Sequence, residues 1–93
     1  MLFALVAFDQ PGHVAQRMEL RPDHLKFLES LGSSLKLAGP YQNEAGELVG
    51  SIVIIEAASL ADARAAFARD PYAQAGLFDT VSIKPWKAAI TRF

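Results

Sequence analysis

The sequence predicts a single α+β domain over residues 1–93, in which two helices cover one face of a four-stranded antiparallel sheet. The chain is long enough for one domain of ordinary size and too short for two. Hydrophobic residues make up 52% of it and charged residues 20%, a composition typical of a globular protein. The predicted elements follow the order βαββαβ, which is the split βαβ arrangement.

The first strand and the first helix are predicted from apolar spacing. Residues 2–8 form a continuous apolar run ended by a Pro-Gly turn, which is typical of a central strand buried on both faces. Helical spacing follows over residues 14–31, but Pro22 interrupts it, so we expect two helical pieces or one kinked helix. Pro22 suits a first-turn position, which would place His24 in the first turn of the second piece. Gly32 is expected to end it. The predicted apolar stripe consists of Val14, Met18, Leu25, Leu28 and Leu31.

A hairpin and a second helix are predicted next. Strands at residues 35–42 and 48–56 are separated by a short polar linker of turn residues. Pro40 cannot donate a hydrogen bond to a neighbouring strand, which places its strand at an edge or a bulge. Residues 59–62 resemble a capping box and start a helix that runs to about Arg69.

The last strand follows a helix stop at Asp70 and Pro71, because the residue before a proline avoids the helical region. Residues 71–75 are expected to form one short turn ended by Gly76. Apolar and polar residues then alternate over residues 81–85 and predict a strand that ends at the proline of that segment.

The other face of this sheet has no predicted cover. Residues 51–55 carry apolar side chains toward both faces, whereas the two helices cover one face only. We therefore expect the same surface of a second copy to cover the bare face. The result would be a two-fold homodimer whose sheets close into an α/β barrel.

Composition excludes several classes of function. The net charge of −1 gives no broad cationic surface, so nucleic acid and anionic membranes are not expected partners. The apolar runs are too short to span a bilayer. With no cysteine there are no disulfides, thiolate nucleophiles or cysteine-ligated zinc sites. The N-terminal run lacks the basic leader of a signal peptide, which predicts a cytoplasmic protein.

Two histidines are candidates for proton transfer near neutral pH. His24 borders the apolar stripe and can face a lined cleft, although a partly buried imidazole bonded to a backbone carbonyl would fit the same pattern. His13 lies in a turn and is expected to be exposed. Asp70 can cap the short turn after it, or it can orient an imidazole as the acid of a hydrolytic triad does. The histidines lack metal-ligand spacing and the glycines form no phosphate loop, so no metal or cofactor is expected.

Five short motifs occur in an order that resembles the YCII-related family over nearly the whole chain. The resemblance implies a ferredoxin-like fold, a dimeric α/β barrel and an active site built on His24 and Asp70. Ser51 matches a position that lines the cleft in such families, and Arg21 and Tyr72 belong to the matched motifs. The motifs span residues 21–28, 38–40, 50–51, 70–72 and 81–86.

The resemblance and the residues together favour a small cofactor-free enzyme acting on a small organic metabolite. His24 would be the general base or acid, Asp70 would orient it, and Ser51 or Arg21 would steady an oxygen or a carboxylate. The few assigned relatives resemble lyases or dehydrochlorinases of ring-derived metabolites, so elimination or isomerisation is the expected chemistry. The alternative is a noncatalytic dimeric module that binds a metabolite or a protein. A third interpretation is a haem-binding or oxygenase relative of the same barrel architecture, with His24 as axial ligand.

Overall fold

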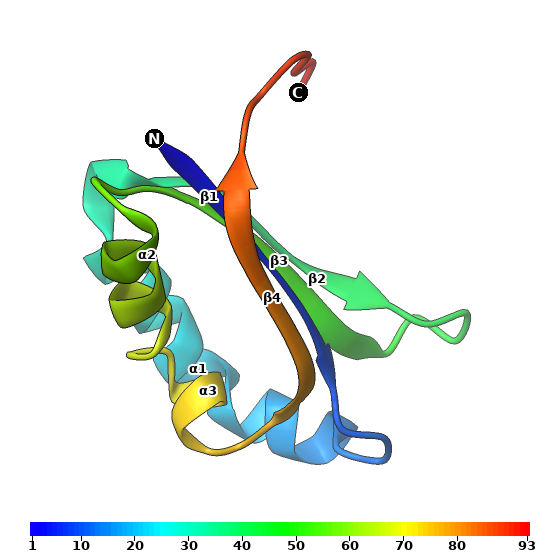
Figure 1. Ribbon diagram of the computed structural model, residues 1–93. Coiled ribbons are helices and arrows are strands. Elements are labelled where there is room, and N and C mark those ends of the chain that lie inside the picture. Colours follow the sequence, from blue (N-terminus) through cyan, green and yellow to red (C-terminus); the bar gives the residue numbers. More distant parts are fainter.

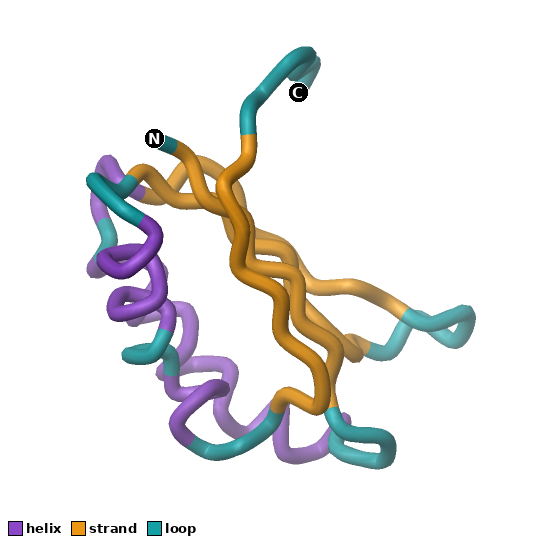
Figure 2. Tube along the Cα trace, in the orientation of Figure 1, coloured by secondary structure: helices purple, strands orange, loops and turns teal.

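The computed structural model describes residues 1–93 and contains the predicted order of strands and helices, with one additional short helix. All helices lie on one side of the sheet (Figure 1, Figure 2). No helix has both the length and the hydrophobicity needed to cross a membrane. The elements are β1 (Leu2–Asp9), α1 (Val14–Ser30), a 3₁₀ turn (Gly32–Ser34), β2 (Leu35–Gln42), β3 (Leu48–Glu56), α2 (Leu60–Phe67), α3 (Pro71–Gln74) and β4 (Phe78–Trp86).

The sheet has the strand order β2-β3-β1-β4, and every neighbouring pair is antiparallel. β1 is central, as predicted, with Leu5 opposite Val53 on β3 and Ile83 on β4. β2 is an edge strand, which confirms the position inferred from Pro40. This order is that of the split βαβ fold.

The core lies between the sheet and the helices. Alternate residues of β1 point toward the helices, because successive side chains of a strand face opposite sides. Burying this apolar cluster is the main contribution to the stability of the domain. The buried cluster consists of Phe3, Leu5, Ala7, Phe27, Leu28, Val53, Ile55, Ala63 and Phe67.

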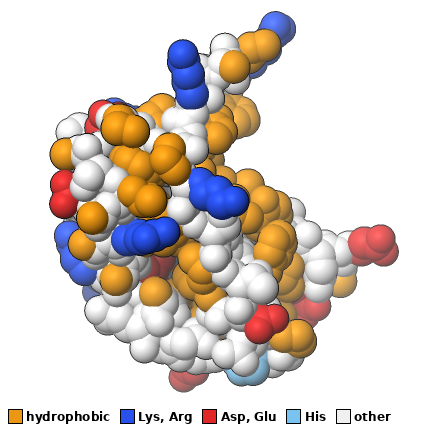
Figure 3. All heavy atoms as spheres, viewed as in Figure 1, with side chains coloured by type: hydrophobic (Ala, Val, Ile, Leu, Met, Phe, Trp, Pro, Cys, Tyr) orange, Lys and Arg blue, Asp and Glu red, His pale blue; other side chains and the backbone are white.

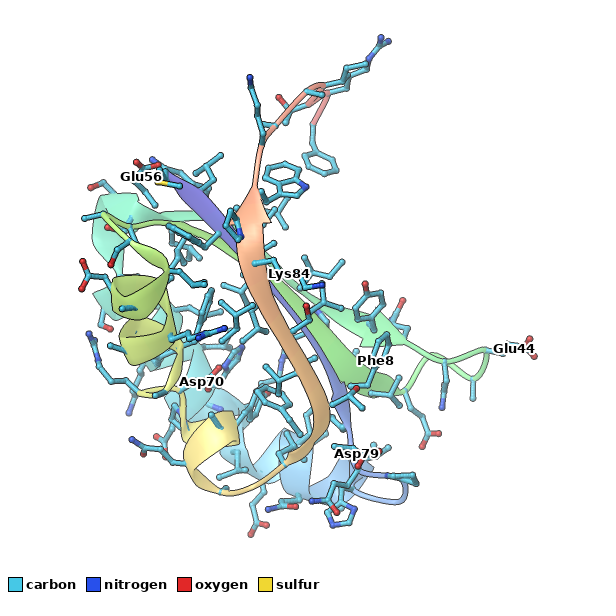
Figure 4. The ribbon with its side chains drawn as sticks, viewed as in Figure 1. Phe8, Glu44, Glu56, Asp70, Asp79 and Lys84 are labelled. Atoms are coloured by element: carbon cyan, nitrogen blue, oxygen red, sulfur yellow. The ribbon has the colours of Figure 1, made fainter.

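The expectation that β1 is buried on both faces is wrong for the single chain. The even-numbered residues of β1 face away from the helices, and Phe8 among them is 45% exposed. Figure 4 shows Phe8 and Lys84 on this far side of the sheet. Ile52 faces the same side, where the C-terminal residues leave a hollow of about 620 Å³ against the sheet. In Figure 3 the C-terminal segment projects from the body beside hydrophobic side chains.

The region around Pro22 is one helix, not two pieces. Proline removes the N–H that would bond the carbonyl of Met18 one turn earlier. Met18 is 47% exposed, so water can reach this part of the helix and bond the carbonyl instead. His24 therefore lies well inside α1, and the predicted first-turn position is wrong.

Most of the predicted boundaries are confirmed. The Ser59 side chain accepts a hydrogen bond from the Asp62 amide and caps α2, which ends at Phe67 instead of about Arg69. Gly32 and Gly76 follow helices with φ of +57° and +70°, a conformation that favours glycine. The short turn predicted after Asp70 is the helix α3.

Candidate active site

The face of α1 that packs on the sheet carries two polar side chains. Arg17 and His24 are 1% and 7% exposed, whereas Leu25 of the predicted stripe is 42% exposed. Steps of seven and four residues place Arg17, His24 and Leu28 on one face of a helix. The predicted stripe is therefore wrong at Met18 and Leu25, and two of the four buried residues of α1 are polar.

His24 and Asp70 form a hydrogen-bonded pair, which confirms the predicted contact. Nδ1 of His24 lies 2.9 and 3.0 Å from the two carboxylate oxygens of Asp70, and both residues are buried. Asp70 also accepts a bond from the Tyr72 amide and caps α3, which packs against α1. Figure 4 shows Asp70 between the helices and the sheet. The carboxylate thus has a structural role and also fixes the imidazole.

The second ring nitrogen of His24 remains available for chemistry. Because the carboxylate accepts the Nδ1 proton, the neutral ring carries its lone pair on Nε2. Nε2 makes no hydrogen bond in the protein, and the residue lines a cavity. Such a nitrogen can take a proton from a molecule bound in the cavity and return it later.

Tyr72 stacks on this histidine and is completely buried. The two rings are 4.0 Å apart at an angle of 16°, and the guanidinium of Arg17 lies 4.4 Å from the tyrosine ring centre. Burial raises the pKa of the Tyr72 hydroxyl above its ordinary 10.0, although the positive charges of Arg17 and Arg21 oppose the rise. Its hydroxyl is a neutral donor at neutral pH, and it has no hydrogen-bond partner.

Arg17, which lines the cavity, forms a buried ion pair with Asp9. Arg17 Nε and Nη2 donate to the two oxygens of Asp9 at 2.5 and 2.9 Å, and Nη2 also donates to Ser51 Oγ at 2.9 Å. Sequence reasoning missed both Arg17 and Asp9. The available signal was the seven-residue step from Arg17 to His24, which places both on one helix face.

The local backbone explains why Ser51 reaches α1. Gly50 precedes it on β3, opposite Phe8 of β1. A Cβ at Gly50 would lie 2.5 Å from the Ala7 carbonyl oxygen, closer than atoms can approach. The Gly-Ser motif therefore allows β1 and β3 to pack closely and directs Ser51 toward the helices.

The structure brings four of the five predicted site residues to one cavity of about 90 Å³, with Asp70 behind His24. Arg21 is partly exposed and forms no ion pair or hydrogen bond. The larger hollow on the far face is lined by no histidine, aspartate or glutamate, so the smaller cavity is the candidate for chemistry. The smaller cavity is lined by Arg17, Arg21, His24, Leu25, Leu28, Ala38, Gly39, Pro40, Ser51, Val53 and Tyr72.

His13 lies outside this cavity. It is the residue before α1, is partly exposed, and its Nδ1 lies 2.8 Å from the carbonyl of Pro11. No three histidine, aspartate or glutamate side chains are grouped in a way that could hold a metal ion. Of the two histidines, only His24 lines the cavity.

Solved structures with the same fold include enzymes. One is the 5-chloro-2-hydroxyhydroquinone dehydrochlorinase TftG from Burkholderia phenoliruptrix in complex with 2,5-dihydroxybenzoquinone, which is 30% identical. It superposes with a TM-score of 0.86 over 94% of each chain. SnoaB, a cofactor-independent oxygenase from Streptomyces nogalater, is 16% identical with a TM-score of 0.63 over 97% of this chain and 94% of its own, and shares the fold.

Sequence relatives cover almost the whole chain. Protein YciI of Escherichia coli O6:H1 is 38% identical in an alignment of 95 positions that covers 94% of this chain and 97% of the relative. An uncharacterized protein of Haemophilus influenzae is 34% identical in an alignment of 96 positions, with the same coverage of both chains. The family model described as the YCII-related domain matches residues 1–87. The chain therefore belongs to the YCII-related domain family.

Proposed function

We propose that this protein is a small enzyme that moves protons on an organic metabolite without a cofactor, with His24 as general base and acid. One observation carries the proposal. Asp70 holds Nδ1 of the imidazole while Nε2 has no partner in the protein, and the residue lines a cavity. Asp70 keeps the ring in one tautomer and orientation, so the base and the acid that orients it are both in place.

The reaction that this equipment supports is elimination of HCl, or an isomerisation, on a hydroxylated ring. In an elimination, Nε2 takes a proton from the substrate, the released electron pair forms a new π bond, and chloride leaves with the C–Cl pair. The substrate loses H⁺ and Cl⁻, so the step needs no oxidant or reductant. The similarity to the dehydrochlorinase TftG, at 30% identity over 94% of both chains, supports this class.

Substrate contacts are assigned to Arg21, Ser51 and Tyr72, which line the cavity beside His24. The cavity of about 90 Å³ is smaller than the roughly 150 Å³ of a cavity that encloses benzene, so it takes the reacting part of a ring. The remainder would lie toward Leu25 and Pro40, which are exposed at its rim. A haem is far larger than this space, so the haem interpretation does not fit the cavity.

The proposed partner in assembly is a second copy of the chain. The far face of the sheet exposes apolar side chains of β1 and β3, including Val6 and Ile52, around a hollow of about 620 Å³. A self-complementary apolar surface is typical of two-fold homodimers. The same surface would serve the alternative, a noncatalytic dimeric module in which His24 and Asp70 only fix the structure.

The decisive experiment measures chloride release from 5-chloro-2-hydroxyhydroquinone by the parent protein and by His24→Gln. We expect release by the parent above the buffer rate, and a loss of about 10²–10⁴-fold in the variant, since that is the usual contribution of a general base. His13→Gln is the matched control and should keep the parent rate. Equal rates in parent and His24→Gln would contradict the proposal, and a parent that neither releases chloride nor binds 2,5-dihydroxybenzoquinone would favour the noncatalytic module.

A further inference from the structure

Ser51 is arranged to donate a hydrogen bond into the cavity. Its oxygen accepts from Nη2 of Arg17 at 2.9 Å, and its own proton has no acceptor in the protein. The residue is buried on β3 and lines the cavity that His24 also lines. A hydroxyl that already accepts from a guanidinium is polarised, which makes it a stronger donor to a third group.

Tyr72 lines the same cavity and carries a second possible donor. Its hydroxyl is the one buried side-chain polar atom without a hydrogen-bond partner, although buried hydroxyls are ordinarily paired. Its ring lies under the same Arg17 guanidinium that donates to Ser51, at 4.4 Å from ring centre to Cζ. An unpaired buried donor costs stability in the free protein, and an acceptor on a bound molecule would offset that cost.

We propose that the Ser51 and Tyr72 hydroxyls together hold one substrate oxygen that gains negative charge when His24 removes a proton. The inference rests on the proposed function of His24, and it names the substrate class: a carbonyl, enol or phenol whose oxygen is conjugated to the reacting position. Nε2 takes the proton, and the electron pair of the broken bond moves onto that oxygen. Ser51 and Tyr72 keep their protons and stabilise the charge through hydrogen bonds.

Arg17 is the positioning residue of this arrangement. Asp9 balances its charge through two hydrogen bonds, so the guanidinium stays buried without an added anion. It orients Ser51 by a direct bond and packs on the ring of Tyr72. Arg21 is the guanidinium at the cavity without an ion-pair partner, so it adds positive charge beside the proposed oxygen site.

The test uses 4-nitrophenol, whose anion is coloured, with the neutral ether 4-nitroanisole as the uncharged reference. We expect the parent to bind 4-nitrophenolate more tightly than the ether. Tyr72→Phe and Ser51→Ala should each weaken phenolate binding by about 10-fold or more, the usual effect of one hydrogen bond to a charged group. Tyr41→Phe is the matched control, because Tyr41 stacks on Phe8 outside the cavity, and it should bind as the parent does.

Further variants separate this proposal from loss of folding and from the proposed function. Tyr72→Phe should melt no earlier than the parent, because it removes an unpaired buried hydroxyl. Ser51→Thr keeps the hydroxyl and should keep the affinity. Arg17→Lys should lower the ratio of phenolate to ether affinity, which loss of stability alone does not change. His24→Gln should lose turnover and keep the phenolate preference.

Two outcomes would overturn the proposal that the Ser51 and Tyr72 hydroxyls hold a substrate oxygen. One is phenolate binding in folded Tyr72→Phe and Ser51→Ala that equals binding to the parent. The other is benzoate that binds more tightly than 4-nitrophenolate and depends on Arg21 alone, since it would assign the cavity to a permanent carboxylate. A phenolate preference without any His24-dependent turnover would uphold the oxygen site and contradict the proposed catalysis, so the two failures are distinguishable.

Discussion

The two faces of the sheet carry different kinds of side chain. The face toward the helices holds Arg17, His24, Ser51 and Asp70 among apolar residues, and the Tyr72 hydroxyl is the one buried side-chain polar atom there without a partner. The far face presents an apolar surface with a larger hollow and no acid or histidine in its lining. The buried polar side chains thus lie on the helix-covered face, where most of them are paired and several line a cavity. The uncovered apolar surface lies on the far face, where a partner could cover it.

The largest expected effect tests the pairing on the helix-covered face. Arg17→Met should lower the free energy of unfolding by about 3–5 kcal/mol, because it leaves the buried Asp9 carboxylate without its cation. Urea unfolding measures the loss. Arg64→Met, on the exposed surface of α2, is the matched control and should change stability by about 0.5 kcal/mol or less. A loss at Arg17 no larger than at Arg64 would mean that the ion pair does not support this face.

The second prediction compares two leucines of one helix. Leu28 is buried against the sheet, so Leu28→Ala should cost about 2–5 kcal/mol of unfolding free energy. Leu25→Ala should cost about 1 kcal/mol or less, because the Leu25 side chain is exposed at the cavity rim. Thermal melts of the two variants give the comparison. If both variants melt alike, the buried face of α1 is assigned wrongly.

The third prediction concerns the far face. If a second copy covers it, Ile52→Glu should raise the dimer dissociation constant about 10-fold or more, equivalent to roughly 1.4 kcal/mol or more. Sedimentation over a range of concentrations measures this constant. The exposed Glu19→Gln, on α1, serves as control. A parent protein that sediments at 10.1 kDa at micromolar concentration would refute the dimer outright.

The smallest effect comes from the Tyr72 hydroxyl at alkaline pH. Burial raises its pKa in the folded state, so the unfolded chain loses this proton first as the pH rises. The contribution is fully present below the unfolded pKa and is lost as the pH climbs through the folded one, with a slope of at most about 1.4 kcal/mol per pH unit. Tyr72→Phe should lack that part of the decline. Parallel stability curves for parent and variant above pH 10 would contradict the assignment.

The sequence predicted the order of elements, the central position of β1 and the edge position of β2, because these depend on apolar runs and on Pro40. The resemblance to the family predicted that His24 and Asp70 act together, and the two side chains are hydrogen-bonded. Apolar spacing did not predict the burial of Arg17, because two helical stripes compete in α1 and this spacing favours the one through Met18 and Leu25. The buried stripe is the one whose polar side chains find carboxylate partners in the folded protein. Asp9 pairs with Arg17, and Asp70, which is 46 positions from His24, pairs with His24.

The helix α3 spans only Pro71–Gln74, and a helix of four residues has no stability of its own. It persists because Asp70 caps it and because Tyr72 stacks on His24. Its amide protons should therefore exchange with solvent whenever the contact between Asp70 and His24 opens, ahead of global unfolding. A molecule bound against Tyr72 would slow that exchange, so α3 offers a native-state reporter of site occupancy that needs no knowledge of the reaction.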